Sequence, residues 1–412
     1  MNELVVAIFV VVYLGMILGG LPLLQLDRTG VALLGAIALI GCHALSLDEA
    51  ARSVHLPTLI LLFAFMVVSA QMRLGGFYGS LTRRVARLPL TPPLLMGALI
   101  LLVAALSAVF SNDIVCLAVA PVLIDACRGR RLAPQPYLLA LACSANIGSA
   151  ATLIGNPQNM LIGETLRLSF SGYLREAALP VGLGLLATWA LLLALTGRRL
   201  VDATVIPTHA AGPEEDIPLD TWQTIKGLAV VLMIVACFLF TDWPREVVAL
   251  TGAGVLLTSR RLHSRRMLGL VDWELLVLFI GLFVVNHGLQ KTGLPARMVA
   301  DLAAAGVPLQ HLGPLFAATF LLSNIVSNVP AVMLLLPSVA HSLAGPMLAL
   351  VSTLAGNLFI VGSVANIIVV DAAARRGIAI GWRAHARVGI PVTLATLAIV
   401  AAYLALRWTA GH

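Results

Sequence analysis

The sequence predicts an all-α polytopic membrane protein with two re-entrant helical hairpins, arranged in two repeats of opposite orientation. Composition is the first reason, because 60% of the 412 residues are hydrophobic and only 11% are charged. The mean hydropathy is +0.99. The second reason is that apolar residues form blocks of roughly 15–22 residues, the length at which a helix crosses a bilayer core. The third is that similar motifs occur in the same order in both halves of the chain.

The paired motifs are two Ser-Asn sequences, each lying between two apolar segments. Ser111-Asn112-Asp113 is followed by Pro121, and Ser327-Asn328-Val329 is followed by Pro337 at the same spacing. A second pair of motifs comes after these sequences. The stretch Gly155-Asn156-Pro157-Gln158-Asn159 corresponds to Gly362-Ser363-Val364-Ala365-Asn366. Each half is therefore expected to contain one hairpin and one broken helix.

These motifs divide the chain into five parts. The chain has spans at 1–55 and 223–271, repeats at 56–196 and 272–412, and a cytoplasmic linker at 197–222. The first repeat holds a hairpin at 92–127 and a broken helix at 137–168. The second holds a hairpin at 312–343 and a broken helix at 346–372. About ten spans result, starting near residues 4, 30, 57, 137, 177, 223, 244, 273, 346 and 388.

The arginine clusters predict the orientation of the chain in a bacterial inner membrane. Arg73, Arg83, Arg84 and Arg87 lie near the first hairpin, whereas the corresponding part of the second half holds only Lys291 and Arg297. Basic residues favour the cytoplasmic side, so the two hairpins are expected to enter from opposite sides. Both termini then lie outside. The net charge of +7 is assigned to topology and contact with membrane lipid rather than to nucleic acid.

Polar residues inside a membrane need partners from protein, water or ligand. Breaking a helix there frees backbone groups that can bind ions, and matching breaks in two inverted repeats indicate a transport site. Gly148, Gly155 and Pro157 interrupt the helical pattern, while Thr152 and Asn156 supply hydrogen-bonding groups. Two hairpin tips and two broken helices would thus enclose one polar site.

These motifs resemble those of the ion transporter superfamily. The sequences SND with IGSAATLIGNPQN, and SNVP with GNLFIVGSVAN, are most similar to the branch of arsenical pumps, sodium/proton antiporter D and citrate-transporter-like anion permeases. Divalent anion:sodium symporters are more distantly similar; Asp113 and Val329-Pro330 depart from their pattern. The resemblance implies an elevator-type secondary transporter and a homodimer. By position it implies a substrate and ion site made of Ser111, Asn112, Asp113, Asn146, Gly148, Thr152, Gly155, Asn156, Pro157, Gln158, Asn159, Ser327, Asn328, Asn357, Gly362, Ser363 and Asn366.

Three side chains have competing interpretations. Asp113 would be an intramembrane carboxylate that carries a proton or cation, or else a cap of the helix beginning near Ile114. Cys116 would contact a soft substrate such as arsenite, or be a small buried hydrophobe, which is the more common case. His287 would relay protons or be a hydrogen-bonded structural residue.

The predicted function is secondary transport of a small anion or oxyacid, with arsenite efflux as one possibility and Na⁺ or H⁺ as the coupling ion. The alternative is a sodium/proton antiporter using Asp113. The sequence contains no HExxH, GxSxG, paired-aspartate GxGD or GxxxxGK[ST] motif, so it predicts neither an enzyme nor ATP binding by this chain. No resident cofactor or metal is expected. The five cysteines form no CxxC motif or disulfide framework.

Overall fold

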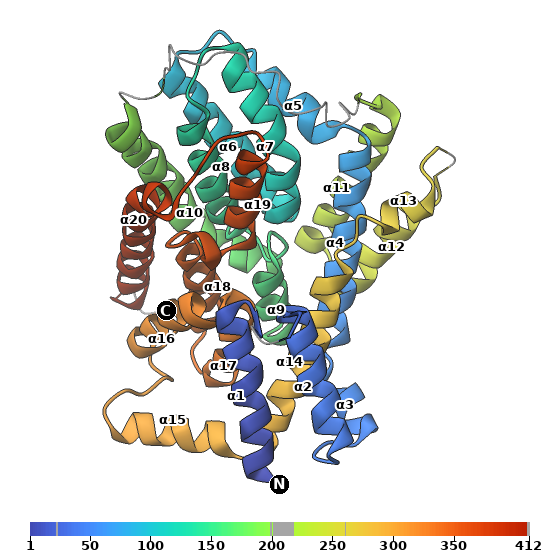
Figure 1. The fold of residues 1–412 in the computed structure, drawn as a ribbon, viewed down its shortest axis with the longest axis vertical. Helices are drawn as coiled ribbons and strands as arrows, with labels where there is room; N and C mark the ends of the chain where they lie inside the picture. The colour runs from blue at the N-terminus through green and yellow to red at the C-terminus, as the bar shows by residue number, and fades with distance from the viewer. Residues whose placement is uncertain (22–23, 198–199, 201–217, 260, 410–412) are drawn as a thin grey trace.

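The computed structural model describes residues 1–21, 24–197, 200, 218–259 and 261–409. Most of the predicted linker at 197–222 therefore lies outside the described residues. The described chain is mostly helical (Figure 1). Its two short strands, β1 (Gly20–Leu21) and β2 (Leu26–Asp27), form an antiparallel pair with Gly20 opposite Asp27.

The order of helices in the first half recurs in the second. The first series is α4 (Leu56–Leu74), α5 (Phe77–Ala86), α6 (Pro92–Val109), α7 (Asn112–Gly129), α8 (Pro134–Ser149), α9 (Pro157–Thr165) and α10 (Phe170–Thr196). The second series is α14 (Trp273–Lys291), α15 (Leu294–Ala304), α16 (Leu312–Val326), α17 (Asn328–Leu335), α18 (Ala344–Ala355), α19 (Val364–Ala374) and α20 (Trp382–Thr409). The long final helices, α10 and α20, each contain a proline in their first half, Pro180 and Pro391.

The segments before these series also correspond. One consists of α1 (Asn2–Leu18), α2 (Arg28–Gly41) and the short α3 (Leu47–Ser53); the other consists of α11 (Thr221–Phe240), α12 (Arg245–Leu257) and the short α13 (Ser264–Leu268). They pack crosswise, because α2 lies against α14 and α12 lies against α4. Residues 1–55 and 223–271, expected to stand outside the repeats, thus have matching helix orders as well.

A glycine at the same place in each series turns the chain into a short helix. Gly76 precedes α5 with φ 69°, and Gly293 precedes α15 with φ 70°. This left-handed conformation costs a glycine little because it has no Cβ. Figure 1 shows α5 and α15 at opposite ends of the molecule. Such a placement is what two oppositely directed repeats require.

Six helices of the described residues are long and apolar enough to cross a membrane, namely α4, α6, α10, α11, α14 and α20. Further apolar helices, among them α1, α2, α16 and α18, are shorter. Breaks divide two of the predicted spans into shorter helices, α8 with α9 and α18 with α19.

Arg130, which follows α7, fixes the chain between α5 and α6. Its guanidinium donates to the carbonyl oxygens of Ala86, Leu88 and Leu90 at 2.8, 3.0 and 2.8 Å. These carbonyls belong to the last residue of α5 and to the connection between α5 and α6. One arginine therefore fixes the base of the segment that leads to the first Ser-Asn motif.

Candidate functional site

The first Ser-Asn motif lies at the break between α6 and α7. Phe110 is extended, Ser111 occupies the N-cap position, and α7 begins at Asn112. The helix therefore begins before Ile114, so Asp113 lies in its first turn and is not its cap. The Asp113 side chain is partly buried, and its carboxylate accepts no hydrogen bond within the described residues. Asp113 thus remains available to a proton or cation.

The second motif lies at the break between α16 and α17. Ser327 joins these helices with φ 78° and ψ 160°, a conformation that L-residues rarely adopt. A residue held in this way costs on the order of 1–3 kcal/mol, and such strain is commonly found at binding sites. The adjacent Asn328 has a buried Oδ1 that finds no hydrogen-bond partner in the described part of the chain.

The first broken helix is formed by local capping and close packing. Asn156 caps α9 by accepting a hydrogen bond from the backbone N–H of Asn159 at 2.9 Å, and Pro157 follows at the first helical position. Gly155 lies so close to Ser149 that an added Cβ would be 2.2 Å from its carbonyl oxygen. The Gly155 carbonyl accepts from the Asn112 backbone N–H at 3.4 Å, which joins the broken helix to the first Ser-Asn motif.

Asn146 lies at the centre of a hydrogen-bond cluster that joins both halves of the chain. Its Oδ1 accepts from Asn112 Nδ2 at 3.0 Å and from Ser363 Oγ at 2.8 Å. Its Nδ2 donates to Asn357 Oδ1 at 2.8 Å and to Asn366 Oδ1 at 3.1 Å. The amide has two donor hydrogens and two acceptor lone pairs, so its capacity is filled.

Thr353 of α18 makes the corresponding contacts to the first broken helix. Its Oγ1 accepts from Asn156 Nδ2 and Gln158 Nε2, each at 3.2 Å, and donates to Asn159 Oδ1 at 3.3 Å. Thr353 occupies the position in α18 that Asn146 occupies in α8, when Asn156 and Asn159 are matched to Ser363 and Asn366. We call the contacts of Asn146 and Thr353 the cross-brace, because each joins one broken helix to the other.

Some amide groups of the predicted site residues have all their hydrogen bonds made, and others have a free donor or acceptor. Asn159 is filled, because its Nδ2 also donates to the Thr152 carbonyl at 3.0 Å and Tyr173 Oη at 3.2 Å. Asn366 Nδ2 donates to the Gly356 and Phe359 carbonyls at 2.8 and 3.0 Å. Among the predicted site residues, three buried atoms have no hydrogen-bond partner within the described part of the chain: Asn112 Oδ1, Asn328 Oδ1 and Asn357 Nδ2.

The remaining predicted residues have structural contacts. Thr152 Oγ1 donates to the Ala108 carbonyl, which ties the loop to the end of α6. Gly148 permits α8 to approach α6, because a Cβ there would lie 2.3 Å from Ala104 Cα. Gly362 approaches Gly356 in the same manner, with an added Cβ 3.0 Å from its carbonyl oxygen.

Comparisons with known proteins agree with this architecture. The family model for citrate transporters matches residues 6–355. The chain belongs to the citrate transporter family. It is 31% identical to the silicon efflux transporter of rice (Oryza sativa subsp. japonica), over 92% of each chain. It is also 31% identical to the inner membrane protein YbiR of Escherichia coli, over 80% of this chain and 82% of that one.

A solved structure supports the fold. The crystal structure of the Alcanivorax borkumensis YdaH transporter covers 100% of this chain and 98% of its own, with a TM-score of 0.55 and 14% identity. At this identity the likeness concerns the fold alone. Membership of the citrate transporter family, together with the apolar helices, makes the chain a multi-pass membrane transporter rather than an enzyme.

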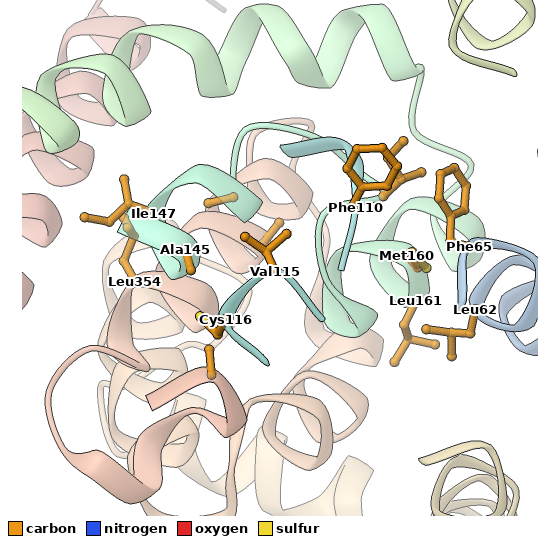
Figure 2. Close-up of a cluster of buried hydrophobic side chains, with 14 of the residues drawn as sticks. Leu62, Phe65, Phe110, Val115, Cys116, Ala145, Ile147, Met160, Leu161 and Leu354 are labelled. Carbon is orange, nitrogen blue, oxygen red and sulfur yellow. The ribbon is translucent and has the colours of Figure 1, made fainter. Parts of the chain in front are cut away.

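Two side chains with competing interpretations make no hydrogen bond to the cross-brace of this transporter within the described residues. Cys116 is fully buried, and Figure 2 shows it in a cluster of hydrophobic side chains with Val115, Ala145 and Leu354. Its surroundings support the interpretation as a small buried hydrophobe. His287 on α14 makes none of the hydrogen bonds found among the described residues, so the structure supports neither of its two interpretations.

Sequence reasoning missed three residues of the hydrogen-bond network around the broken helices. Thr353 belongs to the cross-brace, while Tyr173 and His385 bond to the loops of the broken helices. Tyr173 Oη donates to the Ala150 carbonyl at 2.7 Å, and His385 Nε2 lies 3.1 Å from the Asn357 carbonyl. Their positions match in the two repeats, Thr353 with Asn146 and His385 with Tyr173, and this match is the signal that could have found them. A search for identical residue types overlooks it. Within the described residues, no group of three His, Cys, Asp or Glu side chains could hold a metal ion.

Proposed function

We propose that this transporter is a secondary active permease for a small anion or oxyacid, and that Asp113 couples transport to a proton or cation. One observation carries the proposal. Free polar atoms of Asn112, Asn328 and Asn357 adjoin the cross-brace, and the carboxylate of Asp113 follows directly after Asn112. Two free oxygens and a carboxylate suit a cation, while a free amide N–H suits an acceptor oxygen of the substrate.

The absence of cationic side chains from the cross-brace favours a weakly charged substrate. No Lys or Arg of the described residues donates to any of its members. Neutral amides and hydroxyls can match the hydroxyl groups of a small oxyacid, whereas a polyanion would require more compensating charge. The rice relative is named for silicon efflux, and dissolved silicon is an uncharged hydroxyl acid near neutral pH. Silicic acid and arsenite, which are both largely neutral there, are therefore the first substrates to test.

We further propose alternating access of the elevator type. The cross-brace joins α8 to α19 and α18 to α9, so the broken helices would move as one body. The long helices α10 and α20 pack on this body through α8 and α18. The other body would contain α2, α4, α11, α12 and α14, which pack against one another.

The proposed setting is a bacterial inner membrane, with both termini outside, lipid around the apolar helices and a homodimeric assembly. Arg83 and Arg84 lie in the last turn of α5, and Arg128 lies in the last turn of α7. The positive-inside rule would place this end of the molecule in the cytoplasm. The N-terminus lies at the opposite end in Figure 1, which supports its placement outside.

Solute uptake into proteoliposomes tests the proposed function. Silicic acid, arsenite, phosphate and citrate would be offered separately under an imposed pH or sodium gradient, and the accumulated silicon, arsenic, phosphorus or labelled citrate would be measured. We expect gradient-driven accumulation of an oxyacid or small anion, which is lost in Asp113→Asn. Asp371→Asn is the matched control, because Asp371 is exposed on α19 and pairs with Arg375.

The opposite result is equally specific. If the wild-type protein accumulates none of the four solutes but exchanges sodium for protons, the protein is a sodium/proton antiporter. In that case Asp113 would bind Na⁺ and H⁺ in turn, and the free amide groups would belong to a cation site.

A further inference from the structure

Each repeat contains a tether from its last long helix to the loop of its broken helix. In the first repeat, Tyr173 of α10 donates to the carbonyl of Ala150 at 2.7 Å. In the second, His385 of α20 lies 3.1 Å from the carbonyl of Asn357. A carbonyl oxygen only accepts, so His385 Nε2 carries the hydrogen in this contact. Tyr173 and His385 are both the fourth residue of their helices, which begin at Phe170 and Trp382.

The residues held by these tethers correspond but differ in chemistry. Ala150 and Asn357 each follow the first half of a broken helix, and they occupy matching positions when Asn159 is aligned with Asn366. Ala150 offers no polar side chain. Asn357 is fully buried, with Oδ1 bonded to Asn146 and Nδ2 left without a partner within the described part of the chain.

Close packing of α20 reinforces the second tether. Gly389 faces the same carbonyl, because a Cβ at this position would lie 2.3 Å from the Asn357 oxygen and 3.0 Å from His385 Nε2. The corresponding residue of α10 is Ala177, which does carry a Cβ. In the second repeat the backbone of α20 therefore packs directly against the carbonyl that His385 binds one turn earlier.

We propose that His385 is a positioning residue of the transport site, which orients the free Nδ2 of Asn357 toward an acceptor oxygen of the substrate. This inference rests on the proposed function as a permease for a small anion or oxyacid. Tyr173 gives the comparison within the same molecule, since its tether holds a residue without a side-chain donor. The two repeats thus share one architectural bond, and that of the second repeat holds a residue whose side chain keeps a free donor.

Transport kinetics in proteoliposomes test this role, with silicic acid and arsenite as probes. His385→Leu removes the donor, whereas His385→Gln retains an N–H at a similar reach. We expect His385→Leu to raise the KM for the transported oxyacid by about threefold to tenfold, the loss expected when one hydrogen bond to substrate is misaligned. His385→Gln should restore the KM to within about twofold of the wild-type value. Gly389→Ala should raise the KM in the same direction, because the new Cβ displaces the Asn357 carbonyl.

A double-mutant cycle separates positioning from general stabilisation. Asn357→Ala should raise the KM by itself, and adding His385→Leu to Asn357→Ala should raise it no further, since the side chain to be oriented is gone. Tyr403→Phe is the control. It removes the hydrogen bond that Tyr403 Oη donates to Glu176 Oε2 at 2.8 Å, which joins α20 to α10 outside the cross-brace. This variant is expected to lower the thermal stability in detergent while leaving the KM unchanged.

Three outcomes would overturn the inference. If His385→Leu lowers the melting temperature without changing the KM, the residue is only structural. If Asn357→Ala leaves the KM unchanged while Asp113→Asn abolishes transport, the permease proposal stands and the role of His385 is wrong. If the wild-type protein transports neither these two probes nor phosphate or citrate, the proposed function fails first, and the inference fails with it.

Discussion

Asn146 and Asn328 are both asparagines at broken helices, but their amides are used differently. Asn146 makes four side-chain hydrogen bonds, to Asn112, Asn357, Ser363 and Asn366. Asn328 makes none among the described residues, and its buried Oδ1 lacks a partner. A filled amide in a buried network stabilises the fold, whereas an unfilled one is available to a ligand.

Replacing these two asparagines should therefore have opposite effects on stability and transport. Asn146→Ala leaves several buried groups without partners and should destabilise the protein by about 3 kcal/mol or more. Asn328→Ala should leave the melting temperature nearly unchanged and abolish substrate-driven transport. Thermal unfolding in detergent and uptake into proteoliposomes measure the two effects. Equal losses of stability in both variants would contradict this division.

At the same scale, the two Ser-Asn pairs are the part of the candidate site that the sequence reveals. Ser111-Asn112 and Ser327-Asn328 are identical pairs at matching positions, so a helix break at each pair could be predicted. Asn146 corresponds to Thr353, and Tyr173 corresponds to His385; the residue type changes while the bonding role is preserved. A search for repeated residue types therefore overlooks Thr353, Tyr173 and His385, because hydrogen-bonding geometry is shared and chemical identity is not.

At the scale of the helices, α8 and α6 pack with their backbones in close contact at Gly148. A Cβ on Gly148 of α8 would lie 2.3 Å from Ala104 Cα and 2.5 Å from its carbonyl oxygen. Both atoms belong to the backbone of α6 and cannot move aside as a flexible side chain would. Gly182 of α10 offers the contrast, since nothing lies within 4 Å of a Cβ added there.

Gly148→Ala should separate α6 from α8 and destabilise the protein by roughly 1–3 kcal/mol, the usual cost of overpacking. Gly182→Ala should be neutral or slightly stabilising, because alanine favours helix more than glycine does. Melting temperatures of the two purified variants test this contrast. A Gly148→Ala protein as stable as Gly182→Ala would mean that α6 and α8 pack less tightly than described.

The helices themselves were predictable to different degrees. Apolar blocks interrupted by Gly, Pro and Asn predict the breaks between α6 and α7, α8 and α9, α16 and α17, and α18 and α19. The short α5 and α15 were not predicted, because blocks of apolar residues reveal spans and not short helices that carry arginines. The correspondence of α1–α3 with α11–α13 was missed for another reason. It lies in helix order and crosswise packing, which no shared motif marks.

For the whole molecule, elevator movement requires contacts that form in one state and break in another. Arg245 of α12 bonds to Glu164 of α9, with Nε 2.9 Å from Oε1, and Arg245 Nη2 donates to the Gly163 carbonyl at 2.9 Å. Since α9 belongs to the proposed moving body and α12 to the other, this ion pair joins the two bodies.

Cross-linking positions 164 and 245 should therefore stop transport. In a background with the partly exposed Cys42 and Cys237 replaced by serine, Glu164→Cys with Arg245→Cys would be treated with a bifunctional thiol reagent. We expect transport to fall by about tenfold or more and to recover when the reagent is cleaved.

The control is a second Arg–Glu pair that lies within the proposed moving body. Arg407 of α20 donates to Glu176 of α10 at 2.7 Å. The same reagent applied to Glu176→Cys with Arg407→Cys should leave transport largely intact. Full activity with the 164–245 cross-link in place would show that α9 and α12 do not move apart during transport.

The measurement that tests the central claim most directly is solid-supported-membrane electrophysiology on proteoliposomes of the wild-type and Asp113→Asn proteins. Rapid jumps of silicic acid, arsenite, phosphate, sulfate, small carboxylates or sodium would be applied between pH 6 and 8. The account predicts a current evoked by an oxyacid or small anion in the wild-type protein and no such current in Asp113→Asn. A current evoked by sodium alone, dependent on a pH difference, would contradict it and make the protein a sodium/proton antiporter.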